Sequence, residues 1–406
     1  MRPKAATQQG YTQRLEMTQT GRSQCDHLMN RLLTNFFFVL VFFSAHADAE
    51  ESQTIEAVSA AETAQYAHSL RTVTSGRVTK GVGMAEGEVL RQWPGTYFET
   101  AFAGSEAAFV VGRGDVSLRI RVDDAAPLPL VRPALGLYRV AGLTDGEHRL
   151  RVDVASESQA GPTAFGGFRG GDNTVALPMQ GRALQMEFIG DSGTVGYGNM
   201  STSRECTDDE VWATTDTSQG IAALTAAAFD ADYQVNAISG RGIVRNYDGS
   251  AGDTLVQAYP YVLFDKAEIY QDAGWQPEVV VISLGTNDFS TPLHTEEKWA
   301  SRDELQADFM ATYIRFVQML RERYPRVTFV LWASDLNDGE IAAQVRKVAQ
   351  ALKALGDDRV SFMLVTGLAM DACHWHPSFS DDAAIAARLA RHIREQLGAS
   401  DRMQSE

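Results

Sequence analysis

The chain has 406 residues, more than one hydrophobic core usually serves, so its length favours two domains. Hydrophobic residues make up 44% of the chain and charged residues 22%, a balance that excludes a largely disordered protein. With 36 Lys and Arg against 52 Asp and Glu, the net charge is −16, and such an acidic surface repels phosphate backbones and anionic lipid headgroups. We therefore expect no nucleic-acid partner.

The N-terminal segment has the layout of a secretory signal peptide. Residues 29–31 form a short basic start, residues 32–43 are almost entirely apolar, and Ala-Asp-Ala at 47–49 offers small residues for cleavage. The apolar stretch is short for a membrane span. We therefore expect a signal peptide over Met29–Ala49, an upstream extension before it, and a secreted or periplasmic protein without a stable membrane anchor. An uncleaved N-terminal anchor is the alternative.

The next part of the chain, residues 50–180, has the apolar period of β-strands. Apolar and polar side chains alternate over residues 116–122, and again over residues 148–154, which follow the turn pair Asp145-Gly146. Phe98, Thr100 and Phe102 form another such face. This pattern predicts an all-β sandwich domain.

From about residue 181 to 400 strands and helices alternate. Strands are expected at residues 184–189, 279–284, 327–332 and 360–365, and amphipathic helices around residues 305–320, 341–352 and 385–397. The second of these strands is apolar on both faces, as in the centre of a parallel sheet. The pattern predicts a three-layer α/β domain, with ligands at the carboxyl ends of its strands.

Three of the expected strand ends and loops carry residues suited to hydrolysis. Ser192 follows the first strand, Asn287 follows the central strand, and His376 precedes the last helix. A hydrolase needs a nucleophile, a base within hydrogen-bond reach and donors aimed at the developing oxyanion. The three side chains can supply all of these from one rim.

These segments resemble a known family. Gly190-Asp191-Ser192, Gly240, the Gly-x-Asn-Asp segment at 285–288 and His376 resemble the four blocks of SGNH (GDSL-type) hydrolases. Residues 190–199, 242–247 and 375–378 are similar to segments of carbohydrate esterase family 2. That family also carries an N-terminal jelly-roll sandwich, which residues 93–95 and 145–168 resemble.

The resemblance implies a serine esterase that removes O-acetyl groups from polysaccharides such as acetylated xylan or mannan, without metal or organic cofactor. Ser192 would be the nucleophile and His376 the general base. The oxyanion donors would be the backbone N–H groups of Ser192 and Gly240 and the amide of Asn287. A lipase-like or aryl esterase, or a carbohydrate-binding protein without turnover, are the alternatives.

The chain departs from the pattern where the third member of a catalytic triad would stand. The positions two and three residues before His376 hold His374 and Cys373, and the nearest acid upstream is Asp371. We expect a Ser–His dyad in which a neutral acceptor, such as a backbone carbonyl of the same loop, orients His376; Asp371 and His374 are the other candidates.

Further residues are candidates for substrate contact and for a disulfide. Asp191, Trp375, Trp299 and Tyr247 are possible substrate-binding residues. Cys206 and Cys373 both belong to the expected rim, so in an oxidising compartment we expect them to form a disulfide, with two separate thiols as the alternative.

Overall fold

The computed structural model describes residues 53–80 and 87–404, and the expected signal peptide lies outside the described residues. No helix in these residues is long and apolar enough to cross a membrane. The described residues of the sandwich and of the α/β domain belong to one compact unit.

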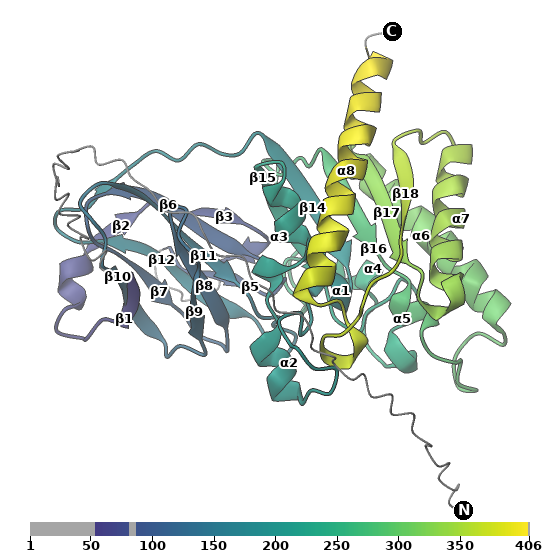
Figure 1. Cartoon of the computed structure of the whole chain (residues 1–406), viewed down its shortest axis with the longest axis horizontal. Helices are drawn as coiled ribbons and strands as arrows, with labels where there is room; N and C mark the ends of the chain where they lie inside the picture. The colour runs from purple at the N-terminus through teal and green to yellow at the C-terminus, as the bar shows by residue number, and fades with distance from the viewer. Residues whose placement is uncertain (1–52, 81–86, 405–406) are drawn as a thin grey trace, which may run out of the picture. The chain divides into compact units, whose positions relative to one another are not determined.

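The N-terminal part is a sandwich of two antiparallel sheets, as the alternating pattern predicted (Figure 1). The first sheet contains β1 (Thr54–Ala57), β2 (His68–Leu70), β4 (Val78–Thr79), β5 (Val89–Arg91), β7 (Ala107–Val111), β10 (Gly136–Ala141) and β12 (Thr163–Gly170). The second contains β3 (Val73–Ser75), β6 (Tyr97–Ala103), β8 (Ser117–Val122), β9 (Leu128–Val131), β11 (Glu147–Val154) and β13 (Val175–Ala176). An apolar cluster fills the space between them, and Phe98, Phe109 and Leu150 are among its fully buried members.

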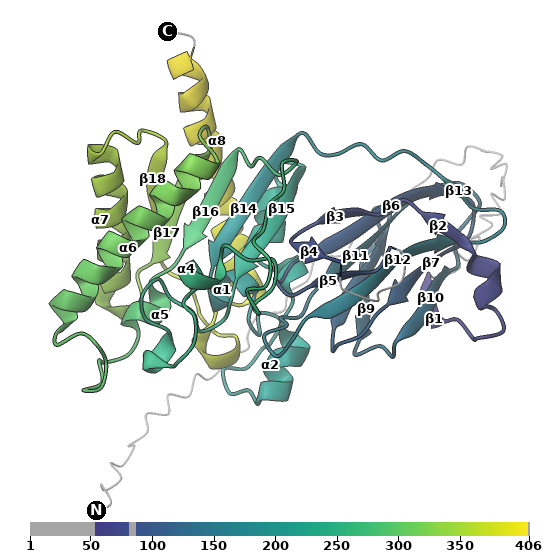
Figure 2. The ribbon, with the colours of Figure 1, turned by 180° about the vertical axis from the view of Figure 1, so that it is seen from behind.

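The C-terminal part is a parallel sheet between two layers of helices. The strand order is β15 (Ala231–Ala237), β14 (Leu184–Gly190), β16 (Val279–Ser283), β17 (Thr328–Ser334) and β18 (Val360–Val365). On one face lie α3 (Ile221–Ala227) and α8 (Phe379–Gln404); α6 (Arg302–Arg323) and α7 (Glu340–Ala354) lie on the other (Figures 1 and 2). Short helices occupy the strand-end loops: α1 (Ser192–Val195), α2 (Asp208–Thr214), α4 (Leu255–Ala258) and α5 (Thr286–Phe289).

The central strand β16 shows why the predicted three-layer fold forms. Val279 and Val281 face the cluster under α3 and α8, whereas Val280 and Ile282 face the cluster under α6 and α7. Both faces of the strand are therefore buried, as its continuous apolar run predicted.

The edge strand β15 is absent from the strands predicted from sequence. Its residues Asp232, Gln234 and Asn236 are polar, so it does not show the apolar run of its neighbours. Asn236 Nδ2 donates to Glu187, and Gln234 Nε2 donates to the hydroxyl of Tyr270. Tertiary contacts thus supply the partners that make this polar strand possible.

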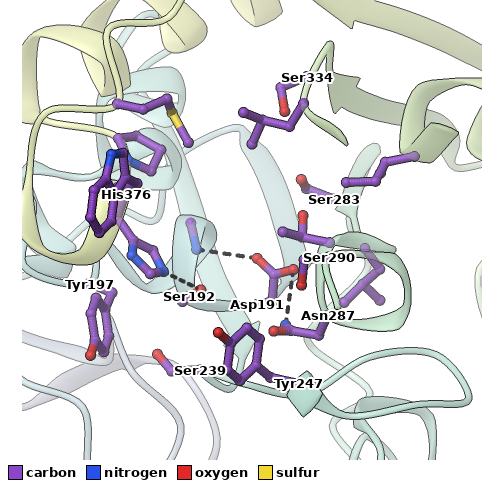
Figure 3. A pocket seen from close by; sticks show the side chains of 18 of the residues that line it. Asp191, Ser192, Tyr197, Ser239, Tyr247, Ser283, Asn287, Ser290, Ser334 and His376 are labelled. Carbon is purple, nitrogen blue, oxygen red and sulfur yellow. Dashed lines mark hydrogen bonds between the residues drawn. The ribbon is translucent and has the colours of Figure 1, made fainter. Parts of the chain in front are cut away.

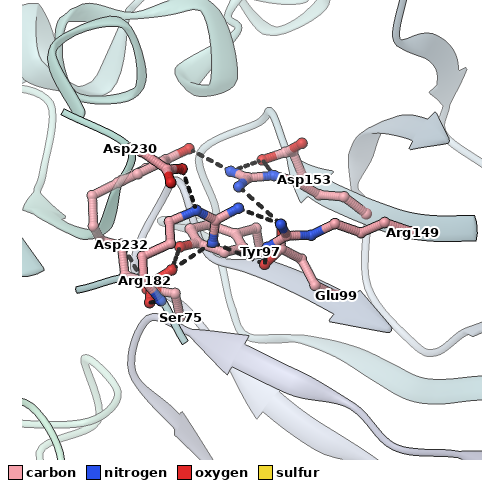
Figure 4. Close-up of polar contacts among 10 residues, drawn as sticks. Ser75, Tyr97, Glu99, Arg149, Asp153, Arg182, Asp230 and Asp232 are labelled. Atoms are coloured by element: carbon pink, nitrogen blue, oxygen red, sulfur yellow. Dashed lines mark hydrogen bonds and ion pairs between the residues drawn. The ribbon is translucent and has the colours of Figure 1, made fainter. Parts of the chain in front are cut away.

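Arginines and carboxylates join the sandwich to the edge of the parallel sheet (Figure 4). Glu99 of β6 accepts hydrogen bonds from Arg149, Arg151 and Arg182, and Arg182 also pairs with Asp232 of β15 at 2.6 Å. Burial alone would raise the pKa of Glu99, but the hydrogen bonds and charges of the arginines outweigh it and lower this pKa to about 2. The sandwich therefore contacts the parallel sheet through a charged, partly buried cluster.

Candidate active site

Ser192 lies in a tight turn between β14 and α1. Asp191 is the N-cap of α1, and its side chain accepts from the N–H of Gly193 at 3.2 Å. A Cβ at Gly190 would come within 2.0 Å of the Thr194 hydroxyl, so only glycine allows the strand to enter this turn. The turn places Ser192 at the carboxyl end of the sheet, where ligands of such sheets bind.

His376 lies in the loop before α8 and faces Ser192 (Figure 3). Its Nε2 is 2.8 Å from Ser192 Oγ, and its Nδ1 is 2.9 Å from the backbone carbonyl oxygen of Cys373. A carbonyl only accepts, so Nδ1 carries the proton and Nε2 is free to accept the hydroxyl proton of Ser192. Burial lowers the pKa of His376, which favours this neutral form.

The expected alternatives for orienting His376 lie elsewhere. Asp371 is exposed, and His374 is exposed with its Nδ1 3.1 Å from the Tyr197 hydroxyl and its Nε2 2.9 Å from the carbonyl oxygen of Cys206. The Tyr197 ring packs against His376 with 4.4 Å between the ring centroids. The structure thus gives His376 a neutral acceptor from its own loop.

The loop that carries His376 is joined to residues 199–207 by a covalent bond and by hydrogen bonds. The structure contains the expected disulfide between Cys206 and Cys373. Arg204 donates to the carbonyl oxygens of Met370 and Ala369, at 2.9 and 2.8 Å. The role of Arg204 was not predicted, because its acceptors are main-chain atoms that no sequence pattern marks.

The three groups expected to bind an oxyanion all border one cavity. Ser192 is the first residue of α1, where helix geometry leaves its N–H without an intrahelical acceptor. Gly240 has φ +80°, a left-handed conformation that glycine adopts without strain, and the space at its missing Cβ is open. The amide Nδ2 of Asn287 lies 3.0 Å from the carbonyl oxygen of Arg241 and 3.3 Å from Asp191 Oδ2.

Two buried carboxylates support this arrangement. Asp288 accepts from the N–H groups of Ile243, Val244 and Arg245 at 3.0, 2.8 and 2.9 Å, and so fixes the loop that follows Gly240. Burial raises the pKa of Asp288 to about 6. It also raises the pKa of Asp191 to about 7, and the nearby charge of Asp288 contributes.

The cavity has a volume of about 650 Å³. Besides the residues above, Trp375 and Tyr247 border it, and these two residues remain 57% and 53% exposed. Trp299, another residue expected to contact substrate, is not among those that border the cavity; its ring packs against the apolar core and its Nε1 donates to Asp308 at 3.0 Å. Within residues 53–80 and 87–404, no three His, Cys, Asp or Glu side chains are grouped to hold a metal ion.

A serine hydroxyl paired with a histidine at the carboxyl edge of a three-layer α/β fold is an arrangement shared by several serine hydrolase classes. The additional presence of Gly240 and Asn287 at the same cavity is typical of the SGNH, or GDSL-type, hydrolases. Comparison with family models agrees: residues 188–393 match the GDSL-like Lipase/Acylhydrolase family, and residues 74–179 match the Carbohydrate esterase 2 N-terminal domain.

Characterised relatives narrow the class to one family. The chain is 45% identical over 307 residues to an acetylxylan esterase/glucomannan deacetylase of Cellvibrio japonicus, covering 75% of this chain and 85% of the relative. It is 30% identical to the cellulase/esterase CelE of Acetivibrio thermocellus over 75% of this chain and 37% of the relative. A solved family two carbohydrate esterase of Clostridium thermocellum, in complex with cellohexaose, matches with a TM-score of 0.71 and 27% identity over 81% of this chain and 99% of that one. The chain belongs to carbohydrate esterase family 2 and is a carboxylic ester hydrolase.

Proposed function

We propose that Ser192 is the nucleophile and His376 the general base of a two-step deacetylation. His376 Nε2 takes the hydroxyl proton as Ser192 Oγ attacks the acetyl carbonyl carbon. His376 then gives that proton to the sugar oxygen, which leaves as a hydroxyl group. A water molecule, deprotonated by His376, releases acetate from the acetyl-serine in the same way. The 2.8 Å contact between Nε2 and Oγ inside the cavity is the observation that carries this proposal.

The negative charge of each tetrahedral intermediate forms on the former carbonyl oxygen. The N–H groups of Ser192 and Gly240 and the amide of Asn287 are the donors proposed to bind it, since all three residues border the cavity beside the nucleophile. Asn287 would turn one N–H from Asp191, its longer contact at 3.3 Å, toward this oxygen.

O-acetylated polysaccharides of the xylan and glucomannan type are the substrates that we propose. The relatives named as acetylxylan esterase/glucomannan deacetylase and the cellohexaose complex of a family member support this class. The exposed rings of Trp375 and Tyr247 at the cavity are suited to pack against sugar rings that flank the acetylated unit. Asp191 is buried and accepts from the Asn287 amide, so in this proposal it orients that amide and does not contact the sugar.

Acetate release from a panel of acetylated polysaccharides tests the proposal, together with 4-nitrophenyl esters of increasing chain length. We expect acetate from acetylated xylan and glucomannan, and a rate that falls steeply beyond acetyl in the ester series. Ser192→Ala serves as the matched control. A preference for long acyl chains with no release from the polymers would support the lipase-like alternative instead.

We also propose that the protein is exported with Met29–Ala49 as its signal peptide and acts on polysaccharide outside the cytoplasm. The basic, apolar and small-residue segments support this proposal. N-terminal sequencing of the exported chain tests it, and a mature protein that starts near residue 50 is the expected result.

A further inference from the structure

A loop of the β-sandwich, residues 155–162 between β11 and β12, reaches the candidate active site. Two buried residues of the sandwich bind Ser158 in this loop: Arg91 donates to the Ser158 hydroxyl at 2.9 Å, and Gln92 Nε2 donates to the Ser158 carbonyl oxygen at 3.2 Å. On the other side, the N–H of Thr217 in the α/β domain donates to the carbonyl oxygen of Ala155 at 3.0 Å. The loop therefore has a defined position between the two domains.

Two side chains of this loop bind Ser239, the residue before the proposed oxyanion donor Gly240. Glu157 Oε1 accepts from the N–H of Ser239 at 2.8 Å, and Gln159 Nε2 donates to the Ser239 carbonyl oxygen at 3.1 Å. Gln159 Nε2 also donates to Glu157 Oε1 at 3.0 Å, so each of the two side chains holds the other in place. Ser239 and Gly240 both border the active-site cavity, and Ser239 is labelled there in Figure 3.

The carbonyl that Gln159 binds belongs to the same peptide unit as the N–H of Gly240. In a trans peptide these two groups point in opposite directions, so fixing the carbonyl fixes the direction of the N–H. A hydrogen bond to the carbonyl also polarises the peptide and makes its N–H a better donor. Gly240 needs such support because its left-handed conformation, φ +80°, lies outside any helix or strand.

We propose that Glu157 and Gln159 are positioning residues that aim the Gly240 N–H at the oxyanion, so that the N-terminal sandwich forms part of the esterase's catalytic machinery. The inference rests on the proposed function, in which Gly240 supplies an oxyanion donor. It assigns the sandwich a task in the chemical step itself, separate from any binding of polysaccharide.

Gln159→Met is the sharpest substitution, because it keeps the length of an exposed side chain and adds no charge beside Glu157, but removes the N–H that binds Ser239. Loss of a direct oxyanion donor costs about 10²–10³ in kcat, so we expect loss of this indirect support to lower kcat by about tenfold. KM for 4-nitrophenyl acetate should change less than about twofold, since an effect confined to the transition state lowers kcat alone. Gln65→Ala, at an exposed sandwich residue outside the loop, is the control with unchanged kinetics.

Two substitutions of Glu157 provide a second test, since one removes the acceptor for the Ser239 N–H and the other retains it. Glu157→Ala should lower kcat by about tenfold, whereas Glu157→Gln keeps an oxygen acceptor for the Ser239 N–H and should stay within about threefold of the parent. Unchanged melting temperatures would show that these variants fold as the parent does.

Three outcomes would overturn the inference while the parent enzyme remains active. These are an unchanged kcat in Gln159→Met, a rise in KM alone, which would make Gln159 a substrate contact, and an equal loss in both Glu157 variants. Failure of the proposed function is recognised separately, because the parent enzyme would then show no Ser192-dependent hydrolysis of 4-nitrophenyl acetate.

Discussion

Cys206→Ser breaks the covalent bond between the loop that carries His376 and residues 199–207. The substitution leaves Cys373 in place, so its side chain can still pack against Gly198. The packing is close: a Cβ added at Gly198 would lie 2.5 Å from the Cβ of Cys373. The bridge spans a sequence separation of 167 residues, for which chain-entropy models give a stabilisation of about 5 kcal/mol. Native disulfides typically contribute about 2–4 kcal/mol, so we expect a loss in that range and below the chain-entropy value.

The same variant should retain most of its activity under conditions where it stays folded. Arg204 still binds the carbonyl oxygens of Met370 and Ala369, and the N–H of His374 still donates to the carbonyl oxygen of Arg204 at 2.7 Å. These native contacts keep the His376 loop in place when the bridge is lost, whereas the bridge acts mainly on the unfolded chain.

Urea unfolding of the parent and of Cys206→Ser, with kcat measured at 25 °C, tests this reasoning. Arg204→Ala is the matched control, because it keeps the bridge but loses the hydrogen bonds to Met370 and Ala369. This variant should lower kcat clearly and change the free energy of unfolding only slightly. Equal unfolding free energies for the parent and Cys206→Ser would refute the stability argument. Two free thiols in the denatured, unreduced mature parent would refute the bridge.

Four further predictions concern the catalytic groups. Ser192→Ala should lower kcat for 4-nitrophenyl acetate by about 10³-fold or more without unfolding, and near-normal turnover would contradict the nucleophile assignment. Asn287→Ala should lower kcat by about 10²–10³, measured with the same ester, and an unchanged kcat would remove it from the oxyanion site. Asp371→Asn should change kcat by less than tenfold, since loss of a true triad acid costs about 10⁴. Only neutral His376 accepts the serine proton, and burial lowers the pKa of this histidine. We therefore expect kcat/KM to rise with pH to a plateau, with an apparent pKa below the ordinary histidine value of about 6.5. An apparent pKa above 7 would contradict a neutral hydrogen-bond partner for His376.

The sequence predicted those parts of the fold that rest on local periodicity. The apolar run Val279–Ile282 predicts a strand buried on both faces, and in the structure this strand is at the centre of the sheet. Strand β15 was not predicted because it lacks the continuous apolar run expected of a strand in the parallel sheet. Its polar residues Asp232, Gln234 and Asn236 alternate with apolar ones, and their partners come from distant segments of the chain.

The same distinction applies to the candidate site. The positions of Ser192 and His376 followed from short motifs, whose geometry is set within a few residues. The contacts of Glu157 and Gln159 with Ser239 join residues that are 82 and 80 positions apart in the sequence. Such pairings depend on how the sandwich meets the α/β domain, which no local pattern encodes.

The acceptor for His376 Nδ1 is a main-chain oxygen, and this limits how evolution can change the site. A carboxylate partner can be removed by one codon change, but every amino acid at position 373 presents the same carbonyl oxygen. An alanine scan of the loop would therefore leave this acceptor in place at every position. Only a change in the path of the backbone, through an insertion, a deletion or a proline, could take that oxygen away from the histidine.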